Sequence, residues 1–248
     1  MKQLVVVAFL FLSFGLSAQV PADTNQTDAQ GRKQGFWKEK INSLDGTGRY
    51  IDNKKTGLWQ IFHQNGMLKS VEEHKDGTLH GISIELDQNG RINKHENYNN
   101  GKLDGECRYY SNLGRINTSV TYKNGIQNGP KNTYYNDGKL QEEGKWVNGQ
   151  REGLTKWFYA DGKLSIEYIY KNGVLEGVQK TYYSTGSLNL EENYKNNELD
   201  GISNEYFESG KLKITGTYVK GQKNGVWKEM DENGKVIKTE KYVNGELK

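Results

Sequence analysis

The sequence has 248 residues, of which 33% are hydrophobic, 11% are aromatic and 30 are glycine. The aromatic content argues against a disordered chain, the glycine content against a helical protein, and the low hydrophobic fraction against a thick α/β core. A formal net charge of +3 gives no electrostatic support for nucleic-acid binding. The single cysteine, Cys107, has no partner for a disulfide within the chain.

The N-terminal segment has the layout of an export signal. A short positive start precedes an apolar run over residues 4–16, and small residues ending at Ala18 follow it. The run is shorter than the roughly 20 residues of a membrane span, so we predict a signal peptide over residues 1–18, cleaved after Ala18. The mature protein would then be periplasmic or extracellular. Residues 19–30 are polar and lack periodicity, which predicts a linker.

A repeat of 24 residues organises the rest of the chain. It starts with a large ring residue, which is followed by glycine seven and sixteen positions later, as in Gly57 and Gly66. The register continues through eight units without an insertion, which predicts a repeat architecture. The ring residues that start the successive units are Tyr50, His74, Tyr98, Tyr122, Trp146, Tyr170, Tyr194, Tyr218 and Tyr242.

Two turn signals in each unit predict two strands. Asn124-Gly125 and Asp137-Gly138 are one such set, and similar pairs recur along the chain. These pairs favour positive φ and close β-hairpins. We therefore predict an all-β fold: an elongated, single-sheet antiparallel meander of 24-residue β-hairpins. Its repeat domain, residues 31–248, would consist of an irregular first unit over 31–49, regular units over 50–241 and a partial last unit over 242–248.

Large side chains within each predicted strand are separated by even intervals. In the first strand of a unit, Leu58 is followed four positions later by Phe62, and in the second strand Leu68 is followed six positions later by His74. Because alternate residues of a strand share a face, we expect such side chains to lie on one face and to stack in ladders with their equivalents in neighbouring units.

Two segments carry the repeat pattern in full: YKNGIQNGPKNTYYNDGKL over residues 122–140 and YKNGVLEGVQKTYYSTGSL over residues 170–188. This pattern resembles the MORN repeat, most closely its bacterial variant, over nearly the whole predicted mature chain. The resemblance implies an array of β-hairpins that binds proteins or membranes. Some bacterial members carry a YwqK-type antitoxin label, but repeat positions are structural and transfer a fold more securely than a function.

Residues that could carry catalysis or bind a metal form no recognisable motif. No Gly-x-Ser-x-Gly, P-loop or HExxH sequence occurs, and the four histidines lack a common spacing. Adjacent acids such as Glu72 and Glu73 point to opposite faces of a strand, so they cannot converge on a substrate. We therefore expect no enzymatic activity, no metal site and no cofactor.

Aromatic residues beyond those that the repeat requires are the candidate partner-binding site. They occupy the thirteenth position of four successive units, where other units carry polar residues such as Asp87 and Ser111. Two further aromatics lie two positions earlier in their own units. Parity places all of them on the other side of the sheet from residues such as Tyr134, where they would form a binding surface or a second small core. The candidate residues are Tyr109, Tyr135, Trp157, Tyr159, Tyr183 and Phe207.

These features together predict an exported, non-enzymatic scaffold that binds a protein or an envelope component through its sheet surface. Two alternatives stay open at this stage. One is an antitoxin or immunity-type partner of a toxin, and the other is a membrane-lipid binding module, against which the near-neutral charge weighs. Nucleic acid is not an expected partner. The identity of the partner and the oligomeric state do not follow from the sequence.

Overall fold

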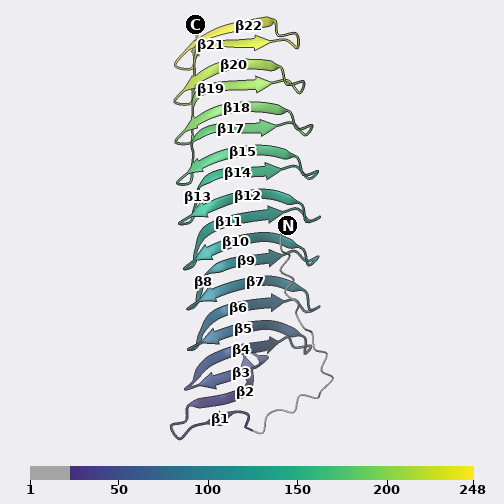
Figure 1. Cartoon of the computed structure of the whole chain (residues 1–248), viewed down its shortest axis with the longest axis vertical. Coiled ribbons are helices and arrows are strands. Elements are labelled where there is room, and N and C mark those ends of the chain that lie inside the picture. Colours follow the sequence, from purple (N-terminus) through teal and green to yellow (C-terminus); the bar gives the residue numbers. More distant parts are fainter. Residues whose placement is uncertain (1–22) are drawn as a thin grey trace, which may run out of the picture.

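A computed structural model of the chain describes residues 23–248. The predicted signal peptide and the first residues of the predicted linker lie outside this range. The regular structure of the described residues is all β, and successive hairpins stack into one tall column that follows the sequence from bottom to top (Figure 1). Each long strand pairs antiparallel with the long strands before and after it in the chain. The predicted open meander is therefore confirmed.

The strands come in pairs that correspond to the repeat, and three of them are interrupted into a short and a long piece. The N-terminal half contains β1 (Gln26–Thr27), β2 (Lys33–Ile41), β3 (Leu44–Ile51), β4 (Lys54–Phe62), β5 (Leu68–Lys75), β6 (Thr78–Leu86), β7 (Ile92–Asn99), β8 (Lys102–Leu103), β9 (Gly105–Tyr110), β10 (Ile116–Lys123) and β11 (Ile126–Tyr134). The C-terminal half contains β12 (Leu140–Val147), β13 (Gln150–Arg151), β14 (Gly153–Phe158), β15 (Leu164–Lys171), β16 (Val174–Leu175), β17 (Gly177–Tyr182), β18 (Leu188–Lys195), β19 (Glu198–Tyr206), β20 (Leu212–Val219), β21 (Gln222–Met230), β22 (Val236–Val243) and β23 (Glu246–Leu247).

Two rows of turns run along the two sides of the column (Figure 1). One row consists of two-residue turns such as Asn124-Gly125, whose φ angles of 51° and 85° are those of a tight hairpin turn. The other row consists of five-residue turns, in which Gly138 donates to the carbonyl of Tyr135 at 2.8 Å. Both rows also bond from unit to unit. In the first row, for example, the Gly149 amide donates to the Gln127 carbonyl at 2.8 Å.

A bulge in each hairpin changes which side chains share a face. Ile61 lies opposite Ser70 and Phe62 lies opposite Leu68, so Lys69 is an extra residue in its strand. The same shift recurs in the other regular units. Because one inserted residue reverses the alternation, Leu68 and the ring residue six positions later lie on opposite faces. The prediction that they share a face was wrong.

A second irregularity in strand pairing occurs at a glycine within the first strand of a hairpin, or at the start of its longer piece where that strand is interrupted. Gly57 has a φ of 64°, and opposite it the pairing of β3 with β4 is irregular. The aliphatic residue that follows, Leu58, is 62% exposed, whereas the next residue, Trp59, is fully buried. We call the side with Trp59 and the ring residues the tyrosine face, and the opposite side the aliphatic face. The exposed residues of the aliphatic face at this position are Leu58, Ile82, Leu154, Val178, Ile202 and Val226.

The best-buried column of the molecule lies on the tyrosine face, at the position of Trp59. This side chain covers the irregular pairing of β3 and β4, and its Nε1 donates to the carbonyl of Arg49 at 3.0 Å. Its ring packs edge-on to Tyr50, with 5.0 Å between the centroids. This column was not predicted from the sequence, because its members differ in size and polarity. They are Trp59, Ser83, Cys107, Thr155, Gln179, Ser203 and Trp227.

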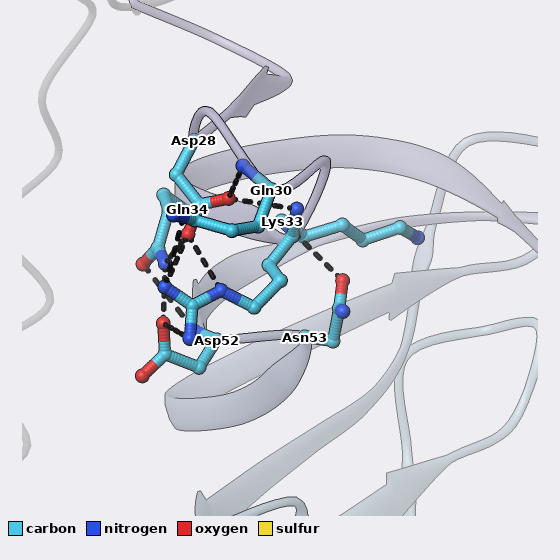
Figure 2. Close-up of polar contacts among 7 residues, drawn as sticks. Asp28, Gln30, Lys33, Gln34, Asp52 and Asn53 are labelled. Carbon is cyan, nitrogen blue, oxygen red and sulfur yellow. Dashed lines mark hydrogen bonds and ion pairs between the residues drawn. The ribbon is translucent and has the colours of Figure 1, made fainter.

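Polar contacts fasten the start of the described chain to the first hairpin (Figure 2). The carboxylate of Asp28 accepts bonds from Arg32 and Gln34, and Gln34 also donates to Asp52 at 2.7 Å. Burial raises the pKa of Asp28, but the bonds from Arg32 and Gln34 outweigh it and lower that pKa to about 2. Asn25 pairs with the backbone of β2 at Lys38 through its side-chain amide. The described part of the segment predicted as a linker is thus bonded to the first unit.

Candidate functional site

Four of the six candidate aromatics begin the five-residue turns of successive units. Their amides and carbonyls close the turn: Tyr135, for example, donates to the carbonyl of Lys139 and accepts from Gly138, both at 2.8 Å. Continuing the strand alternation places these rings on the tyrosine face. We call this set the aromatic row. It consists of Tyr135, Tyr159, Tyr183 and Phe207.

The tyrosines of the aromatic row connect neighbouring units. The Tyr135 hydroxyl donates to the carbonyl of Phe158 at 2.6 Å, and Tyr159 and Tyr183 make the same bond to the unit that follows each of them, at 2.6 and 2.7 Å. All three residues are half-buried. The row therefore contributes to the stack and at the same time exposes part of each ring.

Basic side chains support the same row of turns. The ammonium of Lys139 donates to the carbonyl of Ala160 at 2.7 Å, and Lys163 reaches the carbonyl of Ser184 at 2.8 Å. In an earlier unit Arg115 donates to the carbonyl of Asn136 at 2.8 Å. These bonds occupy the cations with the backbone of the next turn.

Tyr109 and Trp157 lie within strands β9 and β14, on the tyrosine face. The Tyr109 hydroxyl donates to Glu96 at 3.1 Å. Burial raises the pKa of Tyr109, and the neighbouring Glu96 carboxylate raises it further. Trp157 packs edge-on to Tyr168, with 5.6 Å between the centroids, and the guanidinium of Arg151 lies 5.2 Å from its ring.

Tyr135 and Trp157 meet in one hollow of about 540 Å³. The aromatic row extends from this hollow with one ring in each following unit, at Tyr159, Tyr183 and Phe207. Tyr109 lies in an earlier unit. The polar lining of the hollow was not predicted from the sequence; it includes Asn136, Gln141 and Glu142. The signal available for Gln141 was the recurrence of an amide just after the aliphatic position. Amides occupy that place at Asn93, Asn117, Gln141 and Asn189.

Charge in the hollow is neutralised locally. The carboxylate of Glu142 lies 2.6 Å from the guanidinium of Arg151, and both side chains are largely buried. Arg151 also lies 4.8 Å from the Trp146 ring and 5.3 Å from the Tyr170 ring. The cation is therefore held by three aromatic rings and one carboxylate.

One histidine that could serve metal binding or acid–base chemistry, His74, has a carboxylate partner. His74 bonds to Glu72 at 3.1 Å, and this bond lowers the pKa of Glu72 in spite of its burial. Within residues 23–248 no group of three or more His, Cys, Asp or Glu side chains could hold a metal ion. The described part of the chain also contains no helix long and apolar enough to cross a membrane.

Comparison with known proteins identifies the repeat. The family described as the MORN repeat variant matches residues 55–76, 127–148, 151–172, 175–196, 199–220 and 223–244. These segments together cover more than half of the chain, and residues 77–126 between the first two matches fold into the same hairpins. No curated protein matches the sequence. The chain belongs to the MORN repeat variant family.

Proposed function

We propose that this protein is a non-enzymatic binding scaffold that holds a protein or an envelope component against its tyrosine face. MORN repeats form β-repeat scaffolds that often take part in binding. One observation carries the assignment to this face: the aromatic row is continuous over four units and adjoins a hollow that contains Trp157. Partly exposed aromatic side chains are enriched at sites of recognition.

The aliphatic face is the competing surface. Its exposed residues include Leu154, Val178 and Ile202, at 47%, 36% and 55% exposure. Glu106 and Pro130 interrupt this column in the middle of the chain. Each surface is thus continuous over four units, but the rings of the aromatic row combine apolar surface with hydrogen-bonding groups, which favours the tyrosine face.

We also propose that the protein acts outside the cytoplasm. The apolar run over residues 4–16 and the small residues up to Ala18 support this proposal. Mass spectrometry of the native protein should find a mature N-terminus at Gln19. A stable cytoplasmic species that retains residues 1–18 would reject export.

Capture from an envelope extract tests the binding face. We expect the wild-type protein to retain a partner that the double variant Tyr159→Ser/Tyr183→Ser loses. The matched control is Val178→Ser/Ile202→Ser, which changes the aliphatic face and should retain the partner. Melting curves of each variant establish that it is folded. Equal capture by both double variants, or loss in the control alone, would move the binding site away from the tyrosine face.

A further inference from the structure

The hollow beside the aromatic row has a lining suited to a neutral ligand with many hydroxyl groups. It combines the rings of Trp157 and Tyr135 with the side-chain amides of Asn136 and Gln141. Its volume of about 540 Å³ lies in the range of small-ligand sites. Rings offer their faces to C–H groups, and amides both donate and accept hydrogen bonds.

Several polar groups of this lining are available to a ligand. Within residues 23–248, the side-chain amides of Asn136 and Gln141 have no hydrogen-bond partner in the protein. The one carboxylate, Glu142, is paired with Arg151 at 2.6 Å. A ligand that enters the hollow therefore meets open donors and acceptors.

A second hollow lies at the same row of five-residue turns in an earlier unit, and its charge differs. The hollow at Trp157 has no unpaired charge in its lining. The earlier one, of about 500 Å³, is lined by Lys69 and His63 and contains no aromatic residue apart from that histidine. The hollow at Trp157 offers no counter-charge to an anion or a cation, because its carboxylate and the neighbouring guanidinium neutralise each other. Its chemistry thus favours a neutral sugar over a phosphate, an acidic peptide or a basic peptide.

The aromatic row supplies a length scale. Its members recur once per unit, and a unit contributes two strand spacings, or roughly 10 Å, along the column. One disaccharide of an extended β-1,4-linked chain has about this length. A chain that lies along the row from the hollow could place every second sugar against Tyr159, Tyr183 and Phe207 in turn.

We infer that the tyrosine face binds a neutral, extended β-1,4-linked polysaccharide, which enters the hollow at Trp157 and follows the aromatic row. This inference rests on the proposed function and names the class of envelope component that the scaffold holds. A helical α-1,4-linked chain does not keep its sugars in line with the row, so it should bind poorly. A protein ligand is the alternative that the experiment must separate.

Isothermal titration of the purified full chain tests the inference. The probes are the hexasaccharides of β-1,4-linked N-acetylglucosamine and β-1,4-linked glucose, with the α-1,4-linked glucose hexasaccharide as the shape control. At least one β-linked hexasaccharide should bind, more tightly than its own disaccharide and at least roughly tenfold more tightly than the α-linked control, since each added ring contact contributes to affinity. Absence of binding by both β-linked probes, or equal binding of the α-linked one, overturns the inference.

Two variants locate the site. Trp157→Leu removes the ring of the hollow, and Asn136→Ala removes an exposed amide in the turn, where a substitution leaves the strands intact. Each should weaken binding, by about tenfold for the ring. The matched control is Gln64→Ala, which lies at the same turn position of an earlier unit and should bind as the wild type does. Unchanged affinity in both variants places the sugar elsewhere and overturns the inference. If the chain captures a protein through the tyrosine face but binds none of the sugars, the polysaccharide inference is overturned. The proposed scaffold role then remains intact.

Discussion

The first and last regular units fill the buried column differently from several units between them. In the first unit Trp59 packs against Gly48, and in the last Trp227 packs against Gly216. Three inner units pair a glutamate with a small residue at the same two positions. These pairs are Glu72 with Ser83, Glu192 with Ser203 and, where the register of β7 with β9 continues by one residue, Glu96 with Cys107.

The comparison shows that in these five units two neighbouring strands share one volume, which either one large ring or one glutamate fills. A Cβ added to Gly48 would lie 2.2 Å from the Trp59 ring, so the glycine is what makes room for the indole. In the three inner units with a glutamate the carboxylate occupies that room, and the residue beside it is small. Protein interiors are close-packed, so in these five units the size of the residue at one position limits the size of the residue at the other.

The largest effect should come from emptying the column in a tryptophan unit. Trp59→Ala removes a fully buried ring and its bond to Arg49, and should lower the free energy of unfolding by about 3–5 kcal/mol. The same position in an inner unit is the control: Ser83→Ala should cost about 1 kcal/mol or less. Urea denaturation followed by circular dichroism measures both. Similar costs would mean that the two kinds of unit do not differ as described.

A smaller effect should follow from removing the carboxylate of an inner unit. Glu96 is 7% exposed and accepts hydrogen bonds from Tyr98 at 3.0 Å and Tyr109 at 3.1 Å. Glu96→Ala leaves both hydroxyls without this acceptor and should cost about 1–3 kcal/mol. Glu96→Gln keeps an acceptor oxygen and should cost less. Equal losses for the two variants would show that the hydrogen bonds contribute little to stability.

The smallest effect should come from the contacts between turns. Tyr159→Phe and Tyr183→Phe each remove one hydroxyl that donates to the next unit and should each cost about 1 kcal/mol. Phe207 occupies the same position without a hydroxyl, so the ring alone is compatible with the fold. Thermal melting of the single variants measures the change. No shift in melting temperature would indicate that the row serves binding alone.

Those aspects of the fold that depend on local chemistry were predictable from the sequence. Asn124-Gly125 specifies its turn through positive φ angles, and the unbroken 24-residue register specifies the meander. Which face of the sheet a side chain occupies could not be predicted across the bulge by counting alternate residues. The extra residue at Lys69 reverses the alternation, and no residue type marks it unambiguously.

The candidate site was predictable only in part for the same reason. The position of Tyr135 in the repeat revealed the aromatic row, because other units carry polar residues there. Its hydrogen bond to Phe158 depends on how closely two units approach, which no single unit encodes. The role of Gln141 in the hollow depends on the bulge, and the pairing of Glu142 with Arg151 joins separate strands.

A double-mutant cycle at Gly48 and Trp59 tests the shared-volume account most directly. In the wild type, Gly48→Ala forces a methyl group into the indole and should cost about 1–3 kcal/mol. In the Trp59→Ala background the ring is absent, so the same change should be neutral or stabilising, since alanine suits a strand better than glycine. The account predicts a coupling free energy of about 1 kcal/mol or more from urea denaturation of the four proteins. An equal cost of Gly48→Ala in both backgrounds would contradict it.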